Sequence, residues 1–224
     1  MSIQENLLHY QQQIPAEVKL IAVSKTKPIE DIMEAYHAGQ RVFGENKAQD
    51  MAEKYEVLPK DIHWHYIGHL QTNKVKTIAP FVTLIHAVDS LKLMKEINKQ
   101  AIINNRIIDC LLQFHIAEED TKFGLNLEEA QEILLGADYK ELKNIRLTGV
   151  MGMATFTDNK AQVTREFSHL KDIFTTIKQQ FFPSQEHFCE LSMGMSDDFP
   201  LAIEAGSTMI RIGTAIFGAR NYHK

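Results

Sequence analysis

Short β-branched runs alternate with amphipathic helical stretches along the whole chain, and this alternation limits the possible folds most strongly. Strand character is found in eight runs: Lys19–Ser24, Arg41–Phe43, Trp64–Ile67, Thr83–Ala87, Ile107–Ile116, Arg146–Val150, Phe188–Leu191 and Thr208–Ile212. The segments between them carry apolar residues at the 3.6-residue helical period. Strands that alternate with helices form a parallel sheet, which either closes into a barrel or stays open and doubly wound. The strand count favours a single (β/α)8 barrel domain over residues 1–224.

A further helix is expected before the first strand, because Ile3, Leu7 and Leu8 share one helical face. We expect it to close one end of the barrel. The chain has 224 residues, which suits a compact barrel of the kind that typically has about 250. With a net charge of −5 and no face rich in Lys or Arg, the sequence argues against nucleic acid or an anionic membrane as the main partner.

The sequence also indicates where the protein works. The N-terminal stretch is polar and interrupted by charge, unlike a signal peptide. No apolar run approaches the ~20 residues that cross a bilayer. Cys110 and Cys189 match no metal or redox spacing and lie in apolar runs, so both are expected to be buried, reduced thiols. These features predict a cytoplasmic protein.

Lys25 is the most suggestive residue at the end of a predicted strand. Side chains alternate along a strand, so Ile21, Val23 and Lys25 share a face, and Lys25 reaches the mouth of the barrel if Val23 faces its core. Partial desolvation there favours the neutral, nucleophilic amine, which is suited to capturing an aldehyde. The alternative is an ordinary solvated lysine. Lys27 has the same parity but stands just before Pro28, so it is the weaker candidate.

Two turns of small residues follow the last two predicted strands. Ser192 and Gly194 lie in the first turn, where they offer a hydroxyl and a close backbone approach to an anion. Gly213 and Thr214 open the second. Barrel enzymes often bind phosphate between these two loops. Each turn alone is equally well explained by loop geometry or helix capping, but together, opposite a lysine of the first strand, they predict a phosphate site.

Arg211 is the third element of the predicted site. It shares strand parity with Met209, so its side chain can project inward near the barrel mouth. A guanidinium beside a ring nitrogen donates a hydrogen bond to it and disfavours protonation of the ring. The competing interpretation is a surface salt bridge.

Five motifs carry a resemblance to a known family. They are AVSKTKP at 22–28, FGEN at 43–46, HYIGHLQTNK at 65–74, SMGMSDD at 192–198 and RIGTAIFGAR at 211–220. In order and spacing they resemble the pyridoxal phosphate homeostasis protein family, which is similar to the barrel domain of bacterial alanine racemases. The resemblance covers nearly the whole chain.

The resemblance implies that Lys25 holds pyridoxal 5′-phosphate (PLP) as a Schiff base and that Arg211 faces the pyridine nitrogen. It implies a cofactor-binding set of Lys25, Asn46, Ser192, Met193, Gly194, Arg211, Gly213 and Thr214. Lys122 falls where some relatives have a lysine credited with cofactor release. Lys47 departs from the aromatic residue that many relatives carry after Gly-Glu-Asn, and it adds a cation at this corner.

Binding without turnover is the function that we expect. Racemase-type enzymes use the barrel lysine and a tyrosine of a second, β-rich domain as their two proton-transfer groups. The chain ends directly after the eighth predicted strand and its closing helix, so we expect that domain to be missing. The resemblance then implies a monomeric carrier or buffer that passes PLP to apo-PLP enzymes, and a weak PLP-dependent racemase is the first alternative.

A metal-dependent barrel hydrolase is the second alternative. His63 and His65 alternate on the third predicted strand, and His86, Asp89 and His115 lie near other strand ends. Such hydrolases usually carry a His-x-His pair on the first strand, and these residues follow no metal spacing. We therefore expect structural histidines in the barrel wall and no metal.

Overall fold

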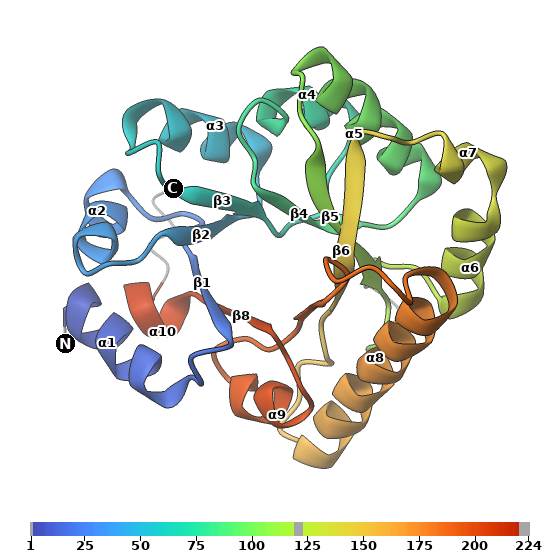
Figure 1. Cartoon of the computed structure of the whole chain (residues 1–224). Helices are drawn as coiled ribbons and strands as arrows, with labels where there is room; N and C mark the ends of the chain where they lie inside the picture. The colour runs from blue at the N-terminus through green and yellow to red at the C-terminus, as the bar shows by residue number, and fades with distance from the viewer. Residues whose placement is uncertain (1, 119–122, 220–224) are drawn as a thin grey trace.

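The computed structural model describes residues 2–118 and 123–219, and its centre is a closed barrel of parallel strands (Figure 1). The strands are β1 (Lys19–Val23), β2 (Val42–Glu45), β3 (His63–Tyr66), β4 (Leu84–Val88), β5 (Ile108–Phe114), β6 (Ile145–Gly152), β7 (Glu190–Ser192) and β8 (Met209–Ile212). They pair in chain order, and β1 pairs with β8 to close the barrel. All eight predicted strands are present, with ends that differ by at most two residues, so the predicted fold is confirmed.

Helices cover the outside of the barrel (Figure 1). They are α1 (Ile3–Gln13), α2 (Ile29–His37), α3 (Ala48–Val57), α4 (Val75–Ile78), α5 (Leu91–Ile103), α6 (Leu127–Leu135), α7 (Ala137–Lys140), α8 (Lys160–Phe181), α9 (Phe199–Glu204) and α10 (Thr214–Phe217), with a 3-10 turn at Thr72–Lys74. The longest, α8, is capped at its N-terminus by Asn159, whose side chain accepts a hydrogen bond from the Gln162 amide. Its apolar stripe, including Phe167, is buried against the sheet as the 3.6-residue period predicts.

The predicted leading helix exists, but its expected position is wrong. Ser2 and Glu5 cap α1 reciprocally, and Leu7 is fully buried. The helix lies in the outer ring beside α2 and α10 instead of closing an end of the barrel (Figure 1). The rings of Tyr10 and Phe199 meet edge to face with centroids 5.8 Å apart, so α1 also contacts α9. The apolar stripe therefore packs as in any other helix of the ring.

Side-chain alternation divides the barrel strands between two cores. One set of buried apolar residues fills the layer between sheet and helices, and a smaller set, which includes Ile21 and Met209, fills the inside of the barrel. Lys25 has the parity of Ile21, and Arg211 that of Met209. Both side chains therefore belong to the inner face, as the sequence predicts, and rise toward the carboxyl ends of the strands.

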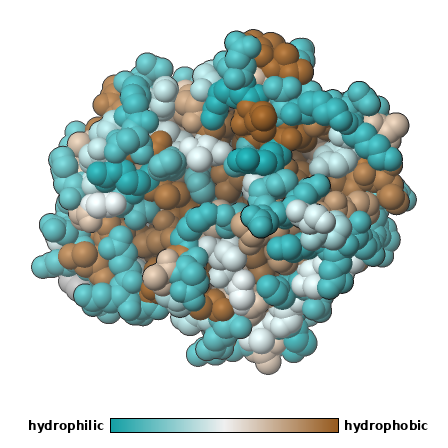
Figure 2. All heavy atoms as spheres, in the orientation of Figure 1, coloured by the Kyte–Doolittle hydropathy of each residue, from teal (hydrophilic) through white to brown (hydrophobic). Residues whose placement is uncertain are grey.

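The face of the molecule seen in Figure 2 is mostly hydrophilic, with hydrophobic patches between the hydrophilic side chains. No helix among the described residues is long and apolar enough to cross a membrane. Cys110 is buried as expected, whereas the expectation for Cys189 is wrong: it is exposed, because β7 begins only at Glu190 and Cys189 precedes it.

The packing of α8 generates a stability prediction. Truncating the fully buried ring of Phe167 to alanine leaves a cavity and should lower the free energy of unfolding by about 3–5 kcal/mol, measured by urea unfolding. The same substitution at Phe156, which is 84% exposed, should cost less than about 1 kcal/mol. Equal losses in the two variants would contradict the assignment of Phe167 to the core.

Candidate functional site

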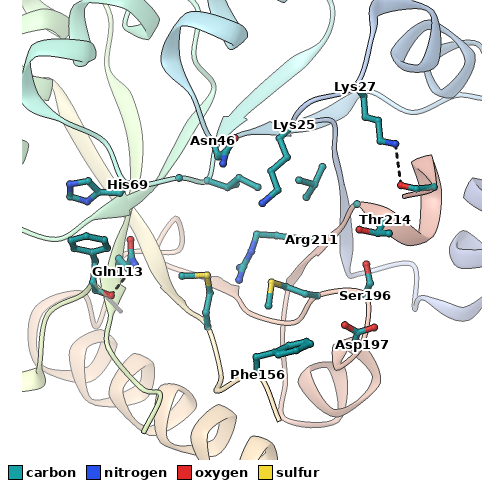
Figure 3. Close-up of a pocket in the computed structure, with 18 residues that line it drawn as sticks. Lys25, Lys27, Asn46, His69, Gln113, Phe156, Ser196, Asp197, Arg211 and Thr214 are labelled. Atoms are coloured by element: carbon teal, nitrogen blue, oxygen red, sulfur yellow. Dashed lines mark hydrogen bonds between the residues drawn. The ribbon is translucent and has the colours of Figure 1, made fainter. Parts of the chain in front are cut away.

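A cavity of about 540 Å³ opens at the carboxyl ends of the strands, where barrel proteins carry their chemistry (Figure 3). Figure 3 shows His69 and Gln113 on one side of it. Thr214 and Ser196 lie on the other side, and Lys25 projects into the space between the two sides. Groups from both ends of the chain thus share one cavity.

The backbone on either side of Lys25 is held in place. Before it, the buried Ser24 donates its hydroxyl to Glu45 at 2.6 Å, and its carbonyl accepts from Lys54 Nζ at 2.9 Å. Lys54 also pairs with Glu45 at 2.7 Å, so the ammonium and the carboxylate compensate each other's burial. After it, Thr26 has φ of 63°, a left-handed conformation that surrounding structure must stabilise. The start of the Lys25 side chain is therefore fixed.

Lys27 also lines the cavity, but its ammonium is committed elsewhere. Nζ donates to the carbonyl oxygens of Phe217, Gly218 and Ala219 at 2.8, 3.0 and 2.9 Å. An ammonium has three donors, and three acceptors at the end of α10 use them. The geometry therefore supports Lys25 over Lys27 as the nucleophilic amine.

Arg211 lies at the floor of the cavity and is only 4% exposed. Nη1 donates to Ser192 Oγ at 2.6 Å, and Nη2 donates to the carbonyl of Gly152 at 3.1 Å. Burial lowers the pKa of Arg211 to about 10, with Asp198 acting in the opposite direction, so the guanidinium is still charged at neutral pH. A fixed, buried cation thus faces the space into which Lys25 projects.

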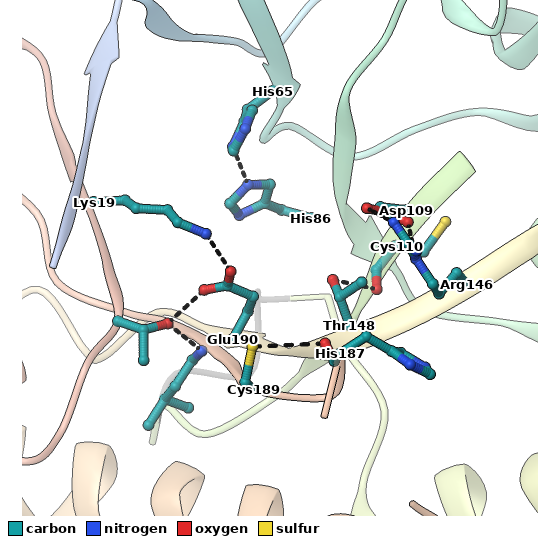
Figure 4. Close-up of polar contacts among 12 residues, drawn as sticks. Lys19, His65, His86, Asp109, Cys110, Arg146, Thr148, His187, Cys189 and Glu190 are labelled. Carbon is teal, nitrogen blue, oxygen red and sulfur yellow. Dashed lines mark hydrogen bonds and ion pairs between the residues drawn. The ribbon is translucent and has the colours of Figure 1, made fainter. Parts of the chain in front are cut away.

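Two buried histidines, His65 and His86, contact each other inside the barrel (Figure 4). His65 Nδ1 is 2.9 Å from His86 Nε2, and His86 Nδ1 is 3.0 Å from Ser192 Oγ. Burial lowers the pKa of His65 to about 3, with Lys19 and His63 acting in the same direction. Burial also holds the pKa of His86 well below its ordinary value. Both rings are therefore neutral at physiological pH.

The loop after β7 turns sharply over the barrel. Gly194 has φ of 96°, and a Cβ there would lie 2.6 Å from Ala202 Cβ, so only glycine fits. Asp198 Oδ1 accepts from the Met195 amide at 2.5 Å and fixes the end of the turn. The turn brings Ser196 to the cavity wall, opposite Lys25.

The loops after β2 and β3 meet closely on the other wall. Asn46 lines the cavity, and its carbonyl accepts from the Tyr66 hydroxyl at 3.1 Å. A Cβ on Gly68 would lie 2.5 Å from that carbonyl oxygen, so glycine is what allows this approach. Neither Gly68 nor its neighbour Ile67 is in the predicted set, although both follow a strand end, the signal that identifies such positions in a barrel.

The structure brings most of the predicted cofactor-binding residues together. Lys25, Asn46, Arg211, Gly213 and Thr214 all line the cavity. Ser192, Met193 and Gly194 are buried beneath it and are not among the residues that line it. The expected direct contact between Ser192 and a phosphate is not supported, because its hydroxyl is engaged by Arg211 and His86.

Several residues that line the cavity were not predicted. They are Ile67, Gly68, His69, Gln113, Phe123, Met153, Phe156, Met195, Ser196, Asp197 and Gly218. Those after β3, β5 and β6 offer only their place after a strand as a signal. Met195, Ser196, Asp197 and Gly218 instead belong to the motifs after the last two strands, within which the sequence does not show which side chains face the cavity. Lys47 is exposed at the start of α3 and is not one of the residues that line the cavity, and Lys122 lies outside the described residues.

The histidines do not support the hydrolase alternative. Within residues 2–118 and 123–219, no group of three or more His, Cys, Asp or Glu side chains could hold a metal ion. His65 and His86 contact each other, whereas His63, two residues before His65 on β3, is exposed. Asp89 pairs with His69 at 3.4 Å.

Comparison with known proteins gives concordant matches. A family model described as alanine racemase, N-terminal domain, matches residues 1–221. The pyridoxal phosphate homeostasis protein of Haemophilus influenzae is 40% identical over 235 residues, covering 99% of this chain and 98% of the relative. PipY of Synechococcus elongatus has been solved without PLP (TM-score 0.89, 36% identity) and with PLP bound (TM-score 0.87, 35% identity). Both structures cover 97% of this chain and 100% of theirs.

The buried histidines generate a prediction about pH. Their pKa values are lower in the folded chain than in the unfolded chain, so below pH 6.5 the unfolded chain binds more protons. The free energy of unfolding should therefore fall as the pH drops from 6.5 toward 3, by up to about 1.4 kcal/mol per pH unit for each ring. Urea unfolding across this range measures the slope.

The matched control uses an exposed histidine far from the two rings. His65→Gln should flatten the slope, whereas His169→Gln should leave it unchanged, because His169 is exposed on α8 and does not act on the pKa of either ring. Identical slopes for His65→Gln and the unaltered protein would show that His65 is not held neutral.

Proposed function

This chain belongs to the pyridoxal phosphate homeostasis protein family, and from that membership we propose that it binds PLP in the cavity at the barrel mouth. We further propose that Lys25 holds the cofactor through a Schiff-base link. The observation that carries the proposal is the placement of Lys25, Arg211 and Thr214 on the walls of one cavity. An amine, a buried cation and a small-residue turn fit the aldehyde, the ring nitrogen and the phosphate of PLP.

The residues that would hold the phosphate lie on the side of the cavity formed by the last two loops. Thr214 and Ser196 offer hydroxyls there, and Gly213 lets the backbone approach closely. A Cβ on Gly213 would lie 3.2 Å from Val23 Cβ, a tight contact with β1. Phosphate sites in barrels are often built from these same two loops.

Arg211 determines what chemistry the site favours. PLP supplies an electron sink for carbanions when its ring nitrogen is protonated. The Arg211 guanidinium can only donate, so beside that nitrogen it leaves no proton on the ring and weakens the sink. This supports reversible storage of the aldehyde over turnover, in agreement with relatives named for homeostasis.

The proposed role is that of a cytoplasmic, monomeric carrier that passes PLP to apo-PLP enzymes. One observation keeps the racemase alternative testable. His69 lies across the cavity from Lys25, pairs with Asp89 at 3.4 Å and stacks on Phe123 with ring centroids 4.3 Å apart. An imidazole in that position can exchange a proton with a bound molecule.

The first test locates the link. After incubation with PLP and reduction with borohydride, peptide mapping by mass spectrometry should find the added mass on Lys25. Lys25→Ala should abolish it, whereas Lys27→Ala should retain it, because the Lys27 ammonium is engaged with three carbonyls. An adduct on Lys27 or Lys122 in the unaltered protein would overturn the assignment.

A second test separates a carrier from an enzyme. Protein loaded with PLP should restore activity to an apo-PLP enzyme while the optical rotation of an added L-alanine solution stays constant. Loss of rotation over time would establish the racemase alternative if Lys25→Ala abolished it. His69→Gln would then show whether His69 supplies the second proton, because glutamine keeps the polar volume and cannot titrate.

A further inference from the structure

A chain of four polar side chains runs inside the barrel from the cavity floor toward the amino ends of the strands. Arg211 contacts Ser192 at 2.6 Å, Ser192 contacts His86 at 3.0 Å, and His86 contacts His65 at 2.9 Å. Each is at most 5% exposed, and each comes from a different strand. Barrel interiors are ordinarily filled by layers of branched apolar residues, so this arrangement needs a physical reason.

The direction of each hydrogen bond among these four side chains follows from Arg211. A guanidinium only donates, so Ser192 Oγ must accept from it. The serine then has one proton to place, and His86 Nδ1 is the acceptor within reach. His86 must carry its own proton on Nε2, which it donates to Nδ1 of His65. Every donor and acceptor at these contacts is satisfied in this arrangement alone.

We propose that His86 and His65 are positioning residues that set the orientation of Arg211 through Ser192, each as the neutral Nε2–H tautomer. Neither imidazole reaches the cavity. Their role is to keep an acceptor available to Ser192, so that Ser192 in turn offers its oxygen to the guanidinium. A buried network rigidifies its members only when all of them are satisfied, so losing His86 should release Arg211.

Arg211 has a second hydrogen-bond acceptor besides Ser192, the Gly152 carbonyl, and this contact is the weaker of the two. Nη2 donates to the Gly152 carbonyl at 3.1 Å, a longer contact than the 2.6 Å to Ser192. Without Ser192 the guanidinium keeps one fixed contact and can rotate about it. Since Arg211 is the buried cation proposed to face the ring nitrogen, its rotation would alter the electronic state of bound PLP. In this respect the inference rests on the proposed function.

The tautomers can be tested without any cofactor. Proton–nitrogen correlation spectra of the imidazole rings in the unliganded protein should show His65 and His86 neutral and protonated on Nε2. They should stay so below pH 6.5, the ordinary pKa of a histidine side chain being about 6.5. A charged ring, or a proton on Nδ1 of His86, would overturn the proposal whether or not the protein binds PLP.

Paired substitutions test the positioning role. His86→Gln keeps an acceptor for Ser192 and a donor for His65, whereas His86→Leu keeps neither. PLP titration followed by absorbance should show His86→Leu weakened about tenfold, with its absorption maximum displaced in the same direction as in Arg211→Gln. His86→Gln should stay within about threefold of the unaltered protein and keep its absorption maximum. An unchanged spectrum in His86→Leu would overturn the proposal.

A second pair of substitutions, at Ser192, keeps the proposal testable if His86→Leu does not fold. Ser192→Ala breaks the chain beside Arg211 while leaving both rings in place, and Ser192→Thr restores the hydroxyl. The alanine variant should reproduce the displaced spectrum and the threonine variant should reverse it. If the unaltered protein gives no PLP spectrum at all, the proposed function fails, and the ring tautomers alone then decide the inference.

Discussion

Barrel closure is the constraint on which the site depends. Pairing of β1 with β8 sets Ile21 opposite Arg211 and Ala22 opposite Ile212. Lys25 and Arg211 are far apart in the chain, yet closure brings both to one cavity, because β1, which ends just before Lys25, pairs with β8, which contains Arg211. An open sheet would leave β1 and β8 unpaired, and the amine and the guanidinium could then not share a cavity.

Closure also creates an interior in which polar groups are costly, and hydrogen bonds between the polar side chains there offset that cost. Arg211 stays charged because Ser192 and the Gly152 carbonyl accept from it. The rings of His65 and His86 avoid charge altogether, since burial lowers both pKa values. One cation with acceptors and two neutral rings is an arrangement that a dry interior tolerates.

The sequence predicts the barrel well because periodicity reports which face of each element is buried. The same parity places Lys25 and Arg211 correctly, since alternation along a strand is fixed by the backbone. Periodicity does not predict the position of α1, because an apolar stripe shows that one face of a helix is buried but not which element covers it. Parity also leaves the role of Ser192 open, since a hydroxyl after a strand suits a ligand and a buried network equally, and its contacts with Arg211 and His86 favour the network.

The comparison of Lys25 with Lys27 illustrates why strand parity alone does not identify a nucleophile. Both have the same parity and line the same cavity. Lys27 gives its three protons to carbonyls at the end of α10 and so ties β1 to the element that follows β8. Its bound ammonium has no lone pair to offer. These contacts give Lys27 a structural role, in keeping with the proposal that Lys25 carries the chemistry.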